Sequence, residues 1–143
     1  MFELDSQLSA DTVLLGSWPL CEVLLSKDAN YPWCILVPRR ANITEVHHLG
    51  MDDRQQFLKE SCHLAELMTS LFNPDTMNVA ALGNVVSQLH VHHIARYKGD
   101  AAWPGPVWGA QAALPYTDLE LEERVSRLRA VLLGDEFQEP EQA

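Results

Sequence analysis

The most restrictive feature of the sequence is a run in which histidines alternate with apolar side chains. Three of the six histidines lie within residues 90–93, and neither Gly nor Pro interrupts the run from Val85 to Arg96. We therefore expect a β-strand over Val85–Arg96. Side chains on a strand point to alternate faces, so Gln88, His90 and His92 should share one face, opposite an apolar row. A polar row of this kind predicts a functional site built on a rigid element.

Length and charge limit the class of protein. A chain of 143 residues with 47% apolar residues is expected to form one globular domain with a real core. The formal charge of −10 argues against a general nucleic-acid binder, although it leaves room for a local pocket that takes one nucleotide. The acidic end, with eight acidic residues and three arginines in 118–143, predicts a solvated helix face and a loose tail.

The cysteines and the N-terminus point to a cytoplasmic location. Cys21, Cys34 and Cys62 are far apart and form no CxxC pair, so neither a disulfide framework nor a cysteine zinc site is indicated. Reduced thiols fit a cytoplasmic protein. The first residues lack the basic and apolar regions of a signal peptide, and no apolar run reaches the roughly 18 residues that span a membrane.

The periodicity along the chain predicts an α+β domain: an antiparallel sheet of about five strands with one main helix and a C-terminal helix. The expected elements are a short helix within 4–16, strands at 18–25, 31–37, 77–82 and 85–96, a short strand near 107, and helices at 51–72 and 117–133. Apolar residues recur at helical spacing in 51–72, and Thr117 with Glu120 matches a capping box. We expect one domain over 1–133, with its core at about 18–108, and a disordered tail over 134–143.

Two histidines at positions i and i+2 of a strand allow more than one chemistry. Their Cβ atoms lie about 6–7 Å apart on the same face. One imidazole could then attack a phosphorus atom while the other binds the same phosphate, or both could bind one metal ion. Histidines that are simply buried or solvated would fit the same spacing.

The surrounding residues resemble the signature of the histidine triad (HIT) family. In that signature three histidines alternate with apolar residues, and the segment 94–97, Ile-Ala-Arg-Tyr, is similar to the family's Ile-Pro-Arg-Tyr. This register places His92 at the third triad position, His90 at the central one and Gln88 at the first. Gln88 therefore replaces a histidine, and it can form hydrogen bonds but cannot carry a positive charge.

The resemblance extends over about residues 18–108. Residues 35–40, Ile-Leu-Val-Pro-Arg-Arg, look like the family's Leu-Val-Ile-Pro-Lys-Arg segment, and Asn84 looks like its asparagine at the end of the preceding strand. Residues 103–105, Trp-Pro-Gly, resemble a Trp-Pro-rich segment of some members. Ala41 is a second departure, because many members have a histidine there.

The resemblance implies a HIT-like fold, a homodimer and a nucleotide hydrolase or transferase that needs no cofactor. In the implied mechanism His90 attacks the α-phosphorus of a nucleoside phosphoramidate or dinucleoside polyphosphate, and water then releases the nucleotide. Gln88 and His92 would bind phosphate oxygens or the leaving group. The remaining candidates bind substrate: Asn84 and Ser87 could donate to the phosphate, and Asp28 or Asn30 could reach the ribose hydroxyls.

Two other functions compete with this one. His90 and His92 with a third ligand could hold zinc in a metal-dependent hydrolase, although the chain has no HExxH motif. Alternatively, the loss of the first triad histidine and the presence of Ala41 fit a nucleotide-binding module without catalysis. Neither a GxGxxG fingerprint nor a P-loop is present.

Other side chains allow a functional and an ordinary role. Arg39 and Arg40 could steer an anionic substrate or belong to a solvated loop. The indoles of Trp33 and Trp103 could stack on a base, with core packing favoured. The pair at 47–48, both histidines, fits a surface or helix-entry position, and His63 fits ordinary packing.

Overall fold

The computed structural model describes residues 1–134 and 136–141. Over these residues the chain forms one five-stranded sheet in the order β1-β2-β3-β5-β4, and every neighbouring pair is antiparallel. The strands are β1 (Thr12–Ser17), β2 (Cys21–Ser26), β3 (Trp33–Pro38), β4 (Thr76–Ala81) and β5 (Val91–Arg96). None of the helices in this part of the chain has the length and apolar character that crossing a membrane requires.

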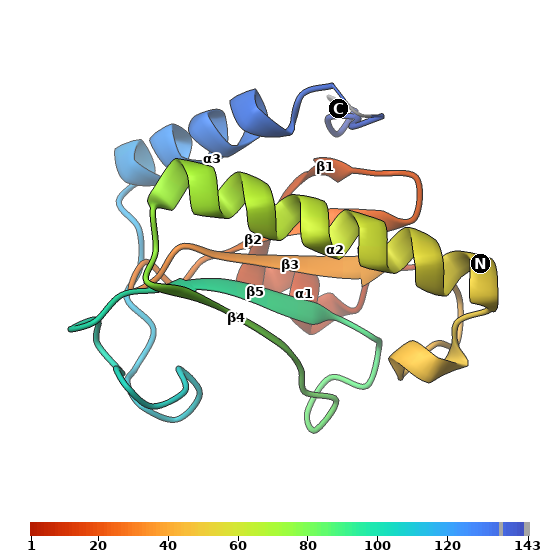
Figure 1. Cartoon of the computed structure of the whole chain (residues 1–143), viewed down its shortest axis with the longest axis horizontal. Helices are drawn as coiled ribbons and strands as arrows, with labels where there is room; N and C mark the ends of the chain where they lie inside the picture. Colours follow the sequence, from red (N-terminus) through yellow and green to blue (C-terminus); the bar gives the residue numbers. More distant parts are fainter. Residues whose placement is uncertain (135, 142–143) are drawn as a thin grey trace.

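The helices lie on both faces of the sheet. The long helix α2 (Met51–Phe72) and α3 (Asp118–Leu132) cover one face, and the short α1 (Ser6–Asp11) lies on the other (Figure 1). A single 3₁₀ turn, η1 (Val46–His48), precedes α2. The expected α+β class with a sheet of about five strands, a main helix and a C-terminal helix is confirmed.

Helix α2 has the bounds that the sequence predicts. Its apolar stripe buries Phe57, Leu64 and Met68 against the sheet. Acidic residues in its first turn stabilise the helix, because their negative charges lie at the positive end of the helix dipole. The helix ends at Asn73, whose left-handed conformation (φ 47°) suits an asparagine, and Pro74 follows.

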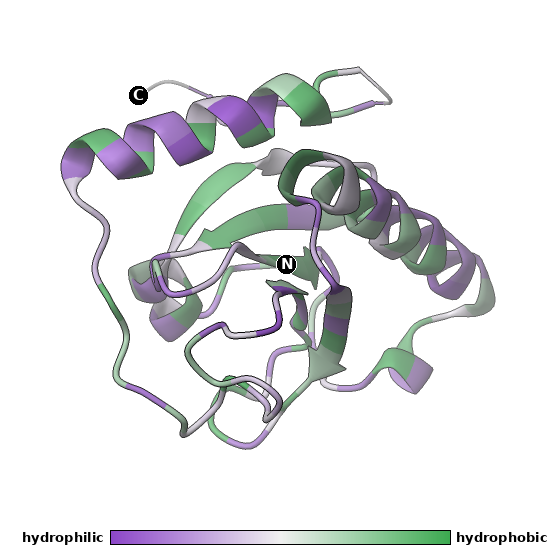
Figure 2. Ribbon diagram, turned by 60° about the vertical axis from the view of Figure 1, so that its left-hand side comes forward, coloured by the Kyte–Doolittle hydropathy of each residue, from purple (hydrophilic) through white to green (hydrophobic). Residues whose placement is uncertain are grey.

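Helix α3 begins at the predicted capping box. The Thr117 hydroxyl accepts a hydrogen bond from the Glu120 N–H, and the Glu120 carboxylate accepts one from the Thr117 N–H. The helix buries Leu128 and Leu132 in the main core. Figure 2 shows α3 alternating between hydrophilic and hydrophobic residues, whereas the strands are mainly hydrophobic.

The N-terminal helix is shorter than expected. Asp5 caps α1, and the helix stops at Asp11, so the prediction of helix as far as Gly16 is wrong over 12–16, which belongs to β1 and pairs with β2. The pairing partners lie further along the chain, from Glu22 opposite Ser17 to Ser26 opposite Thr12, and hydrogen bonding to them overrides the local pattern. For the same reason the strand predicted at 18–25 begins only at Cys21.

The histidine strand is also shorter than expected. It begins at Val91 and not at Val85, because both neighbouring strands meet it there: Val91 is opposite Leu36 of β3 and Ala81 of β4. Residues 85–90 have no strand on either side and form a loop. No strand forms near Val107 in the described part of 98–116, where Val107 instead packs against Tyr31 and Ile94.

The C-terminal segment is in part ordered against the sheet. Phe137 is buried in the main core, and Ser17 and Gln138 exchange backbone hydrogen bonds of 2.8 and 2.9 Å. These contacts contradict the prediction of a disordered tail for residues 136–138. The same prediction for residues 135, 142 and 143 lies outside the described residues.

Candidate active site

A cleft of about 740 Å³ opens on the face of the sheet that carries α1. The sheet forms its floor, α1 forms one wall, and the loop after β4 forms another. Its polar and aromatic lining residues are Gln7, Asp11, Thr12, Ser26, Lys27, Asp28, Trp33, Asn84, His90, His92 and Trp108. The exposed apolar side chain of Val85 lies at its edge.

His90 and His92 meet in this cleft as the sequence predicts. Their ring centroids are 5.0 Å apart, and each residue is 7% exposed. His92 lies on β5 between Ile35 and Ala80, whereas His90 precedes the first residue of the strand. The alternation of faces holds beyond the strand, because Leu89 and Val91 pack in the main core on the opposite face.

The ring of His90 is oriented by the main chain. Its Nδ1 lies 2.8 Å from the carbonyl oxygen of Gln88. A carbonyl only accepts hydrogen bonds, so Nδ1 carries the proton and donates it. In the neutral ring Nε2 then keeps its lone pair, and Nε2 has no hydrogen-bond partner among the residues that the structure describes.

The ring of His92 is surrounded by aromatic side chains. The indole nitrogen of Trp33 lies 2.9 Å from Nδ1 of His92, and the Trp108 ring centroid lies 5.1 Å from that of His92. Burial, together with the charges of His90 and His93, lowers the pKa of His92 to about 3. His92 is therefore neutral in the physiological range of pH.

His93 points to the opposite face and takes no part in the cleft. Its Nδ1 donates to the carbonyl of Val91 at 3.0 Å, so Nε2 accepts the hydrogen bond of the Ser61 hydroxyl at 2.7 Å. Burial lowers its pKa to about 4. His93 is thus a neutral, fully paired core histidine that ties β5 to α2.

The side chain of Gln88 is bound to the N-terminal segment. Its amide oxygen accepts the N–H of Asp5 at 2.9 Å, and its amide nitrogen donates to the carbonyl of Glu3 at 2.8 Å. Gln88 is missing from the described lining of the cleft. The amide thus fixes the segment that leads into α1, and α1 in turn forms one wall of the cleft.

The predicted substrate-binding residues divide into two groups. Asp28 and Asn84 line the cleft, whereas Asn30 and Ser87 do not belong to its described lining. Asn30 instead donates to the Asp28 carboxylate at 2.8 Å and holds it in place. Ser87 is exposed on the loop before His90.

The two arginines after β3 lie outside the cleft. Arg39 donates to the carbonyls of Trp18 and Pro19, at 2.8 Å each, and Arg40 forms an exposed ion pair with Asp53. Both therefore have structural partners. Lys27 is the one cation in the described lining of the cleft.

A buried ion pair supports the loop that follows β5. Arg96 donates to Asp100 at 2.7 and 3.0 Å, and their side chains are 2% and 6% exposed. Asp100 also accepts the N–H groups of Tyr97, Ala102 and Trp103. The arginine that marks the sequence signature thus shapes the loop that carries Trp108 into the cleft.

Sequence reasoning missed Trp108 and the wall formed by α1. Trp108 lies in a segment rich in Gly and Pro, where no periodicity marks a side chain as inward-facing. The sequence predicts a stacking or core role for Trp33, whereas its half-buried ring contacts that of His92. A hydrogen bond across two strands leaves no local signal in the sequence.

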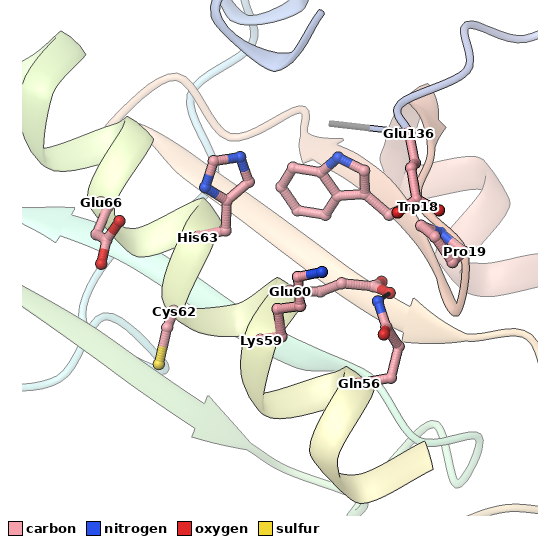
Figure 3. A pocket seen from close by; sticks show the side chains of 9 residues that line it. All are labelled: Trp18, Pro19, Gln56, Lys59, Glu60, Cys62, His63, Glu66 and Glu136. Atoms are coloured by element: carbon pink, nitrogen blue, oxygen red, sulfur yellow. Dashed lines mark hydrogen bonds between the residues drawn. The ribbon is translucent and has the colours of Figure 1, made fainter. Parts of the chain in front are cut away.

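A second cavity, of about 400 Å³, lies on the opposite side of the sheet beside α2. Figure 3 shows His63 facing the indole of Trp18, whereas Cys62 and Glu66 point away from it. Glu60 accepts the N–H groups of Leu20 and Cys21 at 2.9 and 2.8 Å, which makes it a structural carboxylate. Within residues 1–134 and 136–141, no cluster of three or more His, Cys, Asp or Glu could hold a metal ion.

Comparison with known proteins identifies the class. The HIT domain profile matches residues 7–99. A histidine triad protein from Marinobacter aquaeolei VT8 is 52% identical, with a TM-score of 0.90 over 92% of this chain and 96% of that one. The histidine triad protein of Bradyrhizobium japonicum is 44% identical, with a TM-score of 0.88 over 90% of this chain and 96% of that one. The histidine triad protein of Sinorhizobium meliloti 1021 is 40% identical, with a TM-score of 0.88 over 91% of this chain and 96% of that one. No curated protein sequence matches the chain.

The chain belongs to the histidine triad family, and its fold is that of the family. The resemblance noted in the sequence is therefore confirmed.

Proposed function

We propose that the cleft binds a nucleoside phosphate derivative and transfers its nucleotidyl group to water or another acceptor through His90. The observation that supports this proposal is the hydrogen bond from Nδ1 of His90 to the Gln88 carbonyl. It leaves a lone pair on Nε2 inside a cleft large enough for a nucleotide.

The first step forms a covalent intermediate. Nε2 of His90 attacks the α-phosphorus, a P–N bond forms, and the bond from phosphorus to the leaving group breaks with its electron pair on the leaving group. The imidazole becomes positively charged, and its Nδ1–H stays bonded to the Gln88 carbonyl. This hydrogen bond favours the charged ring.

The second step restores the enzyme. A water oxygen attacks the phosphorus, the P–N bond breaks, and its electron pair returns to Nε2 of His90. One water proton leaves to the solvent, and the nucleoside monophosphate is released. His92 donates a hydrogen bond to a phosphoryl oxygen in both steps.

The rest of the cleft binds the substrate. Asn84 donates to the phosphate from the loop after β4, and Ser87, exposed further along the same loop, is the second proposed donor. Asp28, held by Asn30, accepts hydrogen bonds from the ribose hydroxyls. We propose that Gln88 acts through its main-chain carbonyl, because its amide is already paired with the backbone of the N-terminal segment.

The protein is proposed to work as a homodimer in the cytoplasm, on a phosphoramidate or a dinucleoside polyphosphate. The apolar side chain of Val79 on the outer strand β4 is 52% exposed, which fits an edge that a second copy would cover.

Hydrolysis of a substrate panel tests the proposal. Purified protein is incubated with nucleoside phosphoramidates and dinucleoside polyphosphates, and release of nucleoside monophosphate is followed by chromatography. The His90→Asn variant should lose turnover by at least about a thousandfold, because no other group replaces the nucleophile. His47→Asn, which alters an exposed histidine outside the cleft, is the matched control.

A nucleotide-binding module without catalysis is the second candidate. The observation that favours it is the engagement of Gln88 with the N-terminal segment, which removes one donor from the phosphate site. Tight binding of a nucleoside monophosphate with no turnover of any panel member would support this candidate. The zinc alternative has no third ligand among the described residues.

A further inference from the structure

The hydrogen bond between Trp33 and His92 fixes where the imidazole proton lies. An indole N–H can only donate, so Nδ1 of His92, 2.9 Å away, must accept. The single proton of the neutral ring is then on Nε2. Adding a proton to Nδ1 would set two N–H groups against each other, which disfavours the charged ring.

The packing around His92 holds this contact in place. Trp33 is on β3, beside the strand that carries His92, and their ring centroids are 5.5 Å apart. The ring centroid of Trp108 lies 5.1 Å from that of His92 and 6.1 Å from that of Trp33, and both contacts are edge to face. The ring centroid of His90 lies 5.0 Å from that of His92. The three neighbouring rings restrict rotation of the imidazole. With Nδ1 held against the indole of Trp33, Nε2–H is the group left to face the cleft that His92 lines.

We propose that Trp33 is a positioning residue that holds His92 as a neutral imidazole with its proton on Nε2, so that His92 donates a hydrogen bond to the phosphoryl group and does not serve as an acid. The catalytic part of this inference rests on the proposed function. The position of the proton does not, because it follows from the contact with Trp33 alone.

Burial and the two neighbouring histidines also disfavour a charged His92. His90 flanks it within the cleft, and His93 lies next to it on the other face; their charges and burial disfavour a protonated His92. The described cleft lining adds Asp11, Asp28 and Lys27 as its charged groups. The carboxylates would favour a positive His92, yet burial is the largest influence on its pKa, which is lowered to about 3.

A His92 that stays neutral limits which leaving groups can depart from the phosphorus. His92 cannot pass its Nε2 proton to a leaving group, because Nδ1 would have to take up a proton where the indole N–H already lies. The leaving group must therefore depart as a weak base, such as a phosphate or a carboxylate, or collect its proton from water. Among nucleoside phosphoryl compounds, turnover should rise steeply as the pKa of the leaving group falls.

NMR of histidine nitrogens tests the position of the proton directly. In ¹⁵N-histidine-labelled protein, Nδ1 of His92 should show the shift of an unprotonated nitrogen and Nε2 that of an N–H, unchanged down to pH 5. Trp33→Phe keeps a ring but removes the donor, so the two tautomers should mix and the pKa of His92 should rise. Trp108→Phe is the matched control, since Trp108 touches the same ring without a hydrogen bond to it; this variant should keep the wild-type tautomer.

Kinetics separate positioning from simple packing. Trp33→Phe should lower kcat at least about tenfold with a smaller change in KM, because the donor is misplaced in part of the molecules. Its pH–rate profile should gain a limb between pH 5 and 7, and its dependence on the leaving-group pKa should become shallower. A proton on Nδ1 of His92 in the wild type, or an unchanged tautomer in Trp33→Phe, would overturn the assignment. If the tautomer is as stated and no compound is turned over, the proposed function fails and the placement of the proton stands.

Discussion

Replacing Asp100 by Asn should destabilise the protein far more than a surface change of the same kind. The carboxylate holds Arg96 at 2.7 and 3.0 Å, and both side chains are nearly inaccessible to water. Asp100→Asn leaves a buried cation whose other hydrogen-bond acceptors are Asn78 and the carbonyl of Gly105. Removing one partner of a buried pair costs about 3–5 kcal/mol.

A second ion pair of the same chain provides the control. Arg40 contacts Asp53 with the same two distances, 2.7 and 3.0 Å, but the side chains are 46% and 27% exposed. Asp53→Asn should therefore cost less than about 1 kcal/mol. Urea denaturation of the wild type and the two variants measures both losses of stability. Each loss appears as a lower midpoint concentration of urea, with the slope of the unfolding free energy against urea unchanged. Equal losses would refute the claim that the buried carboxylate contributes more than the exposed one, although both hold their arginine at the same two distances.

The effect of Asp100→Asn should depend on pH. The hydrogen bonds from Arg96 lower the pKa of Asp100 from its ordinary value of 3.8 to about 2. A lowered pKa in the folded state means that the ionised carboxylate stabilises the fold above pH 3.8, and that this stabilisation is lost as the pH falls through about 2. The difference between wild type and variant should shrink in that range, and a difference that stays constant would contradict the assignment.

Two further substitutions test the packing on the other face of the sheet. Ser61→Ala removes the hydroxyl that donates to Nε2 of the buried His93 and should cost about 1–3 kcal/mol in urea denaturation; a loss below a few tenths would contradict the assigned pairing. Gly16→Ala places a methyl group against the Phe137 ring and the carbonyl of Gln138, so it should release the C-terminal segment; limited proteolysis should then cut near residue 138, and an unchanged pattern would count against that packing.

The part of the site that was predictable depends on a local rule. Side chains two residues apart on an extended chain lie on the same face, so the sequence alone predicts that His90 and His92 lie together. The same rule placed His93 on the core side. The start of the strand is not predictable in this way, because it depends on where its pairing with β3 and β4 stops.

Other features depend on partners that are distant in sequence. Val13 to Leu15 fit a helix locally, but hydrogen bonding to β2 makes them a strand. Gln88 is placed by two hydrogen bonds to residues more than eighty positions away. The hydrogen bond of Trp33 to His92 likewise crosses 59 positions and depends on the sheet order β3–β5.

Trapping of a nucleotidyl adduct on His90 tests the central claim most directly. The protein is mixed with a substrate that turns over, quenched in denaturant at neutral pH, and analysed by intact-mass and peptide mass spectrometry. We predict a gain of one nucleotidyl group, located on the peptide that contains His90, absent from His90→Asn and retained in His47→Asn. Turnover with no such adduct at any reaction time, or an adduct on another residue, would contradict the account.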